Sequence, residues 1–261
     1  MNPTVSCLMV TRDRPALADR AIGCFAAQHY PHRELVIVSQ GGPAYTERLR
    51  SSVRAHGVPQ SVILDGDPAL RLGALRNLSL DAASGDLVCV WDDDDLNHPD
   101  RLTVQIGALA EAGAHSSFLS DHLQLFGADR ELHWIDWRRP PAGRYPLLPP
   151  TMLMTRDTRF RYPESGRYEH YGEDWQLLLD LHRDVPVQHL HGHGQLYIYT
   201  YHGRNVFPGD HHRRMRIRSR PRAELVAGTA LIRAALAAYP PLGPLRVCGG
   251  DGPAFTVEDD R

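Results

Sequence analysis

The chain has 261 residues, 42% of them hydrophobic, which is enough to bury the core of one α/β domain with additions. Its formal net charge of −2 excludes a global field that would draw it to nucleic acid or to an anionic membrane. The sequence contains no lysine, which excludes a Schiff base and a phosphate-binding loop built around a lysine.

The cysteine pattern and the N-terminal sequence bear on the compartment. None of the four cysteines belongs to a CxxC pair, and residues 1–10 lead directly into an apolar, strand-like run without a leader pattern. No apolar window approaches the roughly 18 residues that span a bilayer. We therefore expect reduced thiols, no transmembrane segment and a cytoplasmic protein, with peripheral attachment to the inner face of the membrane left open.

The first part of the chain alternates short β-branched runs with helical patterns. Strands are predicted at residues 5–10, 34–38, 61–64 and 87–91, and helices at 16–28, 45–55 and 72–83. Pro15 suits the first turn of the first helix. Strict alternation predicts a parallel sheet covered by helices on both faces, with ligands bound beyond the carboxyl ends of its strands.

The second part is less regular. A hairpin is predicted within residues 117–137, a helix at 173–182, strands at 185–190 and 195–201, and an amphipathic helix at 223–239. Between these elements we expect a proline-rich loop at 139–150 and a basic connector at 213–222, and we expect a tail from residue 240.

Four aspartates, residues 92–95, come directly after the strand that ends near Trp91. Like charges a few ångströms apart cost about 1–4 kcal/mol per pair, so folding alone would not select them. A divalent cation removes that cost, and oxygen ligands suit Mn²⁺ and Mg²⁺. The alternative is an acidic loop in which Asp95 caps the next helix.

Several segments resemble family 2 glycosyltransferases of GT-A fold. Residues 91–95 match the strand-D-x-D-D element of that family, residues 72–77 are similar to its G-x-x-x-R-N segment, and residues 10–15 to its V-T-Y-N-R-P loop. The resemblance covers residues 4–102 well and returns at 172–175 and 199–205. Several elements in the family's order and spacing are far more specific than a lone D-x-D.

The resemblance implies an α/β, Rossmann-like and mostly parallel sheet flanked by helices, with a smaller mixed region on the acceptor side. Residues 1–102 would bind the nucleotide sugar, 103–222 would bind the acceptor and carry the base, and 223–261 would form a C-terminal helix and tail. The implied donor-binding residues are Thr11, Arg12, Arg14, Gln40, Asp65, Arg76, Asp92 and Asp93. The implied ligands of Mn²⁺ or Mg²⁺ are Asp94, Asp92 and His202, and Asp174, with Glu173 beside it, would be the general base.

The implied reaction is a single displacement that inverts the anomeric centre of a sugar carried by a nucleoside diphosphate. The family usually ends its second strand with an aspartate that contacts the base, but here Ser39 and Gln40 follow. A UDP-sugar is favoured, GDP- and dTDP-sugars stay open, and Asp65 is a candidate to compensate. The acceptor is a glycan, a lipid-linked sugar, a peptide or a small molecule.

Three other functions compete with this interpretation. A sugar-phosphate nucleotidyltransferase normally carries a glycine-rich loop with a basic residue after its first strand, and a catalytic lysine, which this sequence lacks. A catalytically inactive nucleotide-sugar-binding protein would keep the fold without turnover. A nucleic-acid-binding module would need an aromatic and basic motif that is absent, so stable binding of nucleic acid is not expected.

Some residues keep two interpretations. Glu173 and Asp174 could be ordinary first-turn acids of a helix. The arginines of residues 213–222 could guide an anionic acceptor, form a solvated connector or cover the donor as a lid. His189, His191 and His193 favour a polar rim over a metal site. Finally, four aromatic residues could stack on sugar rings or pack in the core: Trp134, Trp137, Tyr145 and Tyr168.

Overall fold

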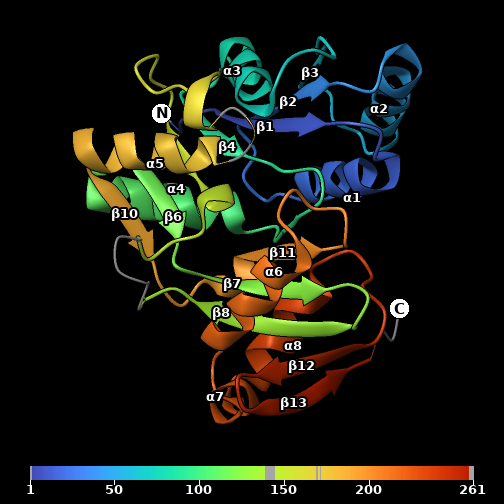
Figure 1. Cartoon of the computed structure of the whole chain (residues 1–261), viewed down its shortest axis with the longest axis vertical. Coiled ribbons are helices and arrows are strands. Elements are labelled where there is room, and N and C mark those ends of the chain that lie inside the picture. The colour runs from blue at the N-terminus through green and yellow to red at the C-terminus, as the bar shows by residue number, and fades with distance from the viewer. Residues whose placement is uncertain (1, 139–144, 169, 171, 259–261) are drawn as a thin grey trace.

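The computed structural model describes residues 2–138, 145–168, 170 and 172–258, and its strands form two sheets (Figure 1). From edge to edge, the first sheet contains β10 (Val187–Leu190), β6 (Ser116–Leu119), β9 (Leu153–Thr155), β4 (Leu87–Val90), β1 (Val5–Thr11), β2 (Arg33–Ser39) and β3 (Ser61–Asp65). The second contains β13 (Gly252–Val257), β12 (Leu245–Gly249), β8 (Glu131–Asp136), β7 (Asp121–Phe126), β11 (Tyr197–Tyr201) and β5 (Leu96–Asn97). The helices are α1 (Pro15–Ala26), α2 (Pro43–Ala55), α3 (Leu72–Ala82), α4 (Arg101–Ala112), α5 (Glu173–Asp184), α6 (Gly209–Met215), α7 (Arg222–Ala227) and α8 (Thr229–Ala237).

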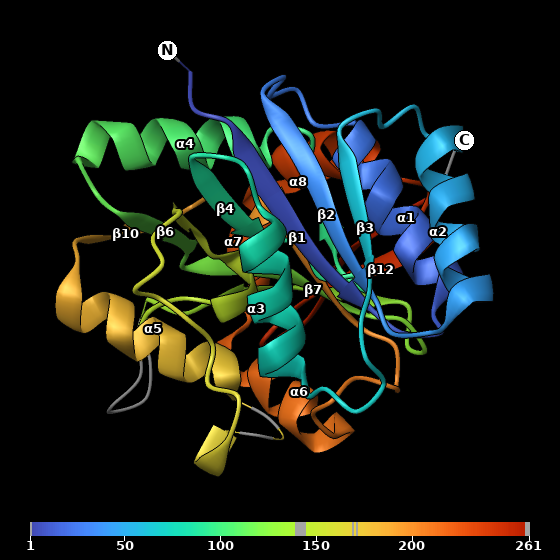
Figure 2. The ribbon, with the colours of Figure 1, turned by 90° about the horizontal axis from the view of Figure 1, so that it is seen from above.

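The first sheet has the predicted parallel, doubly covered form in its N-terminal half. Strands β4, β1, β2 and β3 pair in parallel, and β9 enters antiparallel between β4 and β6. Alternate side chains face opposite cores, since Cys7 and Met9 join one cluster and Leu8 the other. Helices α3 and α5 supply the second cluster, and α1, α2 and α4 contribute to the first (Figure 2).

The carboxyl ends of the central strands meet at one edge of this sheet. Thr11, the last residue of β1, lies in register with Ser39, the last residue of β2, which lies in register with Asp65 of β3. Strand β4 ends at Val90, and the aspartates follow after Trp91. The acidic run therefore emerges beside the ends of three neighbouring parallel strands, where such sheets bind ligands.

The C-terminal part differs from the expectation. Residues 245–257 do not form a tail, because β12 pairs in parallel with β8 and antiparallel with β13. Leu245 and Val247 are 2% and 1% exposed. The glycines and prolines of this stretch suggest a loop, but β13, next in the sequence, and β8, distant in the sequence, supply partners for its hydrogen bonds.

Two further elements depart from the prediction. The expected helix 223–239 is divided at Gly228 into α7 and α8. The expected basic connector, residues 213–222, contains the end of α6 and the 3₁₀ turn Arg216–Arg218. Within the proline-rich loop, residues 139–144 lie outside the described residues. No helix of the described ranges is both long and apolar enough to cross a lipid bilayer.

Candidate active site

Arg76 connects the acidic strand end to helix α5. Its Nη2 donates to Asp92 Oδ1 at 3.1 Å, and its Nε donates to Glu173 Oε1 at 3.2 Å. The Arg76, Asp92 and Glu173 side chains are 13%, 19% and 6% exposed. The guanidinium also lies 5.5 Å from the centre of the Tyr162 ring, a cation–π contact. Two segments 97 residues apart are thus joined by one buried cation.

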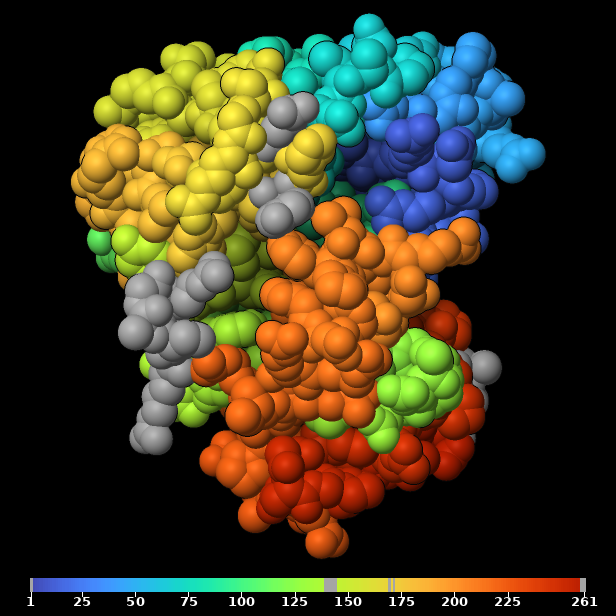
Figure 3. All heavy atoms as spheres, in the orientation of Figure 1, coloured from blue at the N-terminus to red at the C-terminus, as the bar shows by residue number. Residues whose placement is uncertain are grey.

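Asp93 and Asp94 share a second arginine. Arg14, which precedes α1, lies 2.8 Å from Asp94 Oδ2 through Nη1 and 3.3 Å from Asp93 Oδ1 through Nη2. The hydroxyl of Thr11 donates to Asp93 Oδ2 at 2.6 Å. His202 Nε2, from the segment after β11, lies 3.1 Å from Asp94 Oδ2. Space-filling atoms show that the segment after β11 (orange) crosses the middle of one face (Figure 3).

Asp95 is a structural residue. It is 1% exposed, and its carboxylate accepts hydrogen bonds from the Tyr197 hydroxyl and, at 2.7 Å, from the Thr200 backbone N–H. These bonds join the acidic run to β11 of the second sheet. Asp95 does not cap the next helix, because α4 begins after Asp100.

The four carboxyl groups differ in acidity. Burial raises the pKa of Asp92, and burial together with the charge of Asp94 raises the pKa of Asp93 to about 7. Burial, and after it the negative charge of Asp94, holds the pKa of Asp95 well above its ordinary value. For Asp94, burial is outweighed by the His202 hydrogen bond and the Arg14 charge, so its pKa is lowered. Asp94 is therefore the carboxylate that stays charged most readily.

The donor set at Asp94 fits a divalent cation. Asp94 Oδ2 and His202 Nε2 are 3.1 Å apart, close to the roughly 3 Å expected between neighbouring ligands about 2.1 Å from an octahedral ion. Among the described residues, Asp92 forms no group of three potential ligands with Asp94 and His202, and its role as a metal ligand stays a prediction. Asp94 and His202 would hold the ion directly, while Arg76 holds Asp92.

The three-residue group found in the described part of the chain is Glu131, His133 and Cys248, on β8 and β12. Its carboxylate already has two cationic partners, since Glu131 lies 2.7 Å from Arg246 and 3.2 Å from Arg216. A metal ion there would be repelled by both guanidinium groups. We assign this group to the packing of the second sheet.

Three predicted donor-binding residues stand apart from the aspartates. Gln40 Nε2 donates to the backbone carbonyl of Asp67 at 3.0 Å, and Thr46 Oγ1 donates to Asp65 Oδ1 at 2.5 Å. Arg12 is exposed. Within the described residues, none of Arg12, Gln40 and Asp65 forms a hydrogen bond or ion pair with residues 92–95. Their donor-binding roles stay predictions.

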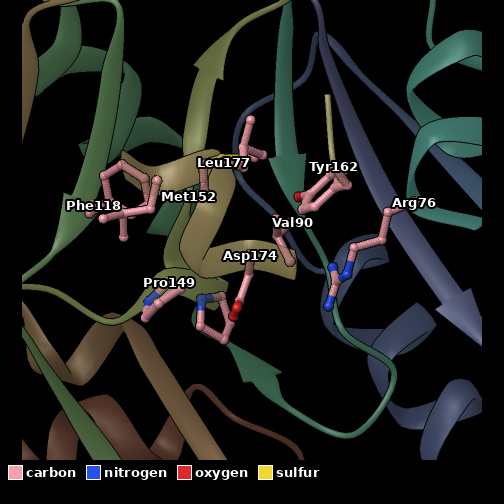
Figure 4. Close-up of a pocket in the computed structure, with 10 residues that line it drawn as sticks. Arg76, Val90, Phe118, Pro149, Met152, Tyr162, Asp174 and Leu177 are labelled. Carbon is pink, nitrogen blue, oxygen red and sulfur yellow. The ribbon is translucent and has the colours of Figure 1, made fainter. Parts of the chain in front are cut away.

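Asp174 lies in the first turn of α5 and lines a cavity of about 10 Å³, room for about one water molecule. Figure 4 shows its carboxylate and the Arg76 guanidinium toward one side of the cavity, and apolar side chains such as Phe118 and Leu177 toward the other. Burial, and after it the charge of Glu173, raises the pKa of Asp174 to about 6. A carboxyl group with this pKa can accept a proton near neutral pH.

Two residues of the 72–77 segment have packing roles that the sequence analysis missed. Asn77 Nδ2 donates to the Tyr162 carbonyl at 2.8 Å, and Asn77 Oδ1 accepts from the Tyr162 N–H at 2.9 Å. A Cβ atom on Gly73 would lie 2.1 Å from the Pro163 carbonyl oxygen. Both residues pack α3 against the segment that carries Tyr162. The sequence offered one indication of these roles, because both residues lie in the same motif as Arg76.

Replacing Asn77 with alanine is expected to lower the free energy of unfolding by about 2–3 kcal/mol, because the Tyr162 N–H and C=O lose their buried partner. Urea denaturation measures this loss. As a control, Asp81→Ala in the same helix removes an exposed ion pair with Arg161 and should cost less than about 1 kcal/mol. Equal losses in the two variants would show that the Asn77 clamp adds no stability.

The basic run is largely occupied by internal contacts. Arg216 lies 2.7 Å from Asp129, and Arg220 lies 2.8 Å from Asp121 and 4.1 Å from the centre of the Trp134 ring. The ring of Trp134 is 2% exposed and belongs to the core. These contacts favour a structural connector over a phosphate-guiding surface.

The alternating histidines do not share one strand. β10 ends at Leu190, so only His189 of the three lies on it. The Nε2 atom of His189 lies 3.0 Å from the Nε2 atom of His182 in α5. The ring of His182 is stacked on Tyr145, with ring centres 3.6 Å apart. The structure therefore agrees with a polar rim rather than a metal site.

Comparison with known proteins identifies the family of this chain. The sequence profile described as Glycosyl transferase family 2 matches residues 6–141, which is more than half of the chain. The chain belongs to glycosyl transferase family 2. WcaA of Escherichia coli (strain K12), named as a colanic acid biosynthesis glycosyl transferase, is 32% identical over 128 residues, 49% of this chain and 43% of that protein. The chain thus spans less than half the length of this curated relative.

Solved structures show the same fold. TarS 1–349 of S. aureus in complex with UDP-GlcNAc has a TM-score of 0.61 at 15% identity, over 90% of this chain and 67% of that one. The mannosyltransferase PcManGT of Pyrobaculum calidifontis, in complex with GDP-Man and Mn²⁺, has a TM-score of 0.57 at 15% identity, over 93% and 67%. The predicted GT-A fold, with a mixed second sheet, is confirmed.

Proposed function

We propose that this protein is an inverting glycosyltransferase that moves a sugar from a nucleoside diphosphate to an acceptor hydroxyl or amine. The observation that carries the proposal is the Arg76 bridge, which joins Asp92 at the acidic strand end to Glu173, the neighbour of Asp174. A site for the leaving diphosphate and a candidate base are thereby held together by one residue. Family membership supports the reaction class.

The residues divide the chemistry between them. Asp94 and His202 would hold Mn²⁺ or Mg²⁺, which when bound supplies a Lewis acid for the leaving diphosphate. The Arg14 and Arg76 guanidinium groups, freed in part from their carboxylates, would add positive charge beside the phosphates. Asp174 would accept the proton of the acceptor nucleophile, and attack opposite the leaving group inverts the anomeric centre.

The nucleotide base is proposed to contact the ends of β2 and β3. Thr46 bonds to Asp65 and lies 2.9 Å from Ser39, so Asp65 stands beside the position where the family usually carries its aspartate. This placement supports Asp65 as the compensating base contact and keeps a UDP-sugar as the favoured donor. The neighbouring structures contain both UDP-GlcNAc and GDP-Man, so GDP- and dTDP-sugars are tested alongside it.

A thermal-shift screen of UDP, GDP and dTDP, each with and without Mn²⁺, tests the donor site. A ligand at a hundred times its dissociation constant stabilises the native state by about 2.7 kcal/mol, which corresponds to a rise of about 5–10 °C in Tm. We expect one diphosphate to give such a shift, and only with Mn²⁺. No shift with any diphosphate would contradict the proposal.

An assay of diphosphate release from the matching nucleotide sugar distinguishes an enzyme from a binding protein. Turnover, even by slow hydrolysis of the donor, is expected for a transferase. Binding without release, with acceptor candidates of all four classes present, would instead indicate an inactive nucleotide-sugar-binding protein.

The rate of transfer should depend on pH through Asp174. The base acts in its charged form, and its pKa is raised to about 6 by burial and by Glu173. The value of kcat/KM should therefore rise with pH, reach half its plateau near pH 6, and fall about tenfold for each unit well below that. A profile that stays flat down to pH 5 would exclude Asp174 as the titrating base.

A further inference from the structure

The Arg14 guanidinium lies where its positive charge would repel a metal ion bound to Asp94. Its two terminal nitrogens contact Asp93 and Asp94, and Asp94 Oδ2 accepts both Arg14 Nη1 at 2.8 Å and His202 Nε2 at 3.1 Å. The oxygen best suited to bind a cation is therefore already bonded to a guanidinium group. The Arg14 side chain is 32% exposed, against 2% for Asp93 and 16% for Asp94, so the arginine has room to turn outward.

The neighbouring charges reinforce this effect. Arg20 Nη2 lies 3.4 Å from the Asp94 backbone carbonyl, and Arg76 holds Asp92. A divalent ion that bound here without a diphosphate would thus meet carboxylates already paired with arginines. Unlike charges a few ångströms apart attract strongly and like charges repel equally strongly, so Arg14 and the ion compete for one oxygen. A diphosphate changes the balance, because it brings negative charge that pairs with Arg14.

We propose that Arg14 hinders the binding of a divalent cation to Asp94 until its ion pair passes to the donor diphosphate, so that metal and donor bind only together. This inference rests on the proposed function. Through its guanidinium, Arg14 accordingly makes the affinity of the protein for the metal and its affinity for the diphosphate depend on each other. By linkage, the factor by which diphosphate tightens metal binding equals the factor by which metal tightens diphosphate binding.

The test measures Mn²⁺ binding to the full chain without nucleotide, from the electron paramagnetic resonance signal of free Mn²⁺. Arg14→Met is expected to bind Mn²⁺ at least about tenfold more tightly than the wild type. Arg14→Lys keeps the positive charge but loses the forked contact with both carboxylates, so its affinity for Mn²⁺ should lie between those of the wild type and Arg14→Met. Arg48→Met is the control, because it removes an equal charge from the exposed surface of α2, and it should stay within about threefold of the wild type.

The same titration with UDP or GDP completes the cycle. In the wild type, one of these diphosphates should tighten Mn²⁺ binding at least about tenfold, and in Arg14→Met the tightening should fall to about threefold or less. Circular dichroism spectra that match the wild type show that the variants are folded. If Arg14→Met binds Mn²⁺ alone no better than the wild type, while the wild type binds Mn²⁺ with a diphosphate, only the inference fails. If no protein binds Mn²⁺ under any condition, the proposed metal site fails with it.

Discussion

Asp174→Asn should reduce kcat by about 10²–10⁴-fold, because asparagine cannot take the proton of the acceptor. The dissociation constant of the donor diphosphate should change by less than about threefold, since the variant alters the reaction step and not ground-state binding. Steady-state kinetics and calorimetric titration of the same preparations measure the two quantities. The shape of the side chain is preserved, so the fold of α5 is retained.

Asp180→Asn is the matched control for this variant. Asp180 lies on the same helix, and its side chain, 26% exposed, pairs with Arg183 at 2.8 Å. Its replacement should leave kcat within about twofold of the wild type, as expected for a surface pair. Substantial turnover by Asp174→Asn, or an equal loss in both variants, would remove Asp174 from the role of base.

Arg76→Met is the second change with a large expected effect. It leaves Asp92 and Glu173, 19% and 6% exposed, without the cation between them. Removal of one partner from a buried ion pair typically costs about 3–5 kcal/mol, because the remaining charge is desolvated and unpaired. Urea denaturation should show a loss of this size, and transfer should also fall because α5 is no longer tied to the acidic strand end.

A double variant separates charge from packing at this position. Glu173→Gln in the Arg76→Met background removes one of the two unpaired charges and should recover part of the lost stability. Arg161→Met, which breaks the exposed pair with Asp81, is the control and should cost less than about 1 kcal/mol. Without any recovery in the double variant, the loss would be attributed to packing of the arginine stem.

Sequence patterns predicted the first sheet well because its strands and helices have strong local periodicity. Within the predicted strand 34–38, residues 35–38 are apolar on both faces, as a central parallel strand requires, and they form the core of β2. The strand at 245–249 lacks such a signal. Gly249, its last residue, and Gly250 after it resemble a loop, and pairing with β8 and β13 determines that the segment is a strand.

The candidate site was predictable as a set of residues but not as a set of contacts. Consecutive aspartates after a strand lie in a turn without a fixed period, so the sequence does not say which carboxylate faces which partner. The structure places Asp93 at Thr11 and directs Asp95 to Tyr197, and it separates Asp92 from the Asp94 and His202 pair. These partners are 82 to 108 residues away, and the family motifs imply Asp94 and His202 as joint metal ligands but not the contacts of Asp93 and Asp95.

A crystal structure of the protein soaked with Mn²⁺ and the diphosphate chosen by the thermal-shift screen tests the central claim most directly. We expect an anomalous scattering peak about 2.1–2.2 Å from Asp94 Oδ2, with an imidazole nitrogen of His202 and oxygens of the diphosphate completing the ligands. A diphosphate bound elsewhere, or a manganese peak away from Asp94 while that site stays empty, would contradict the account.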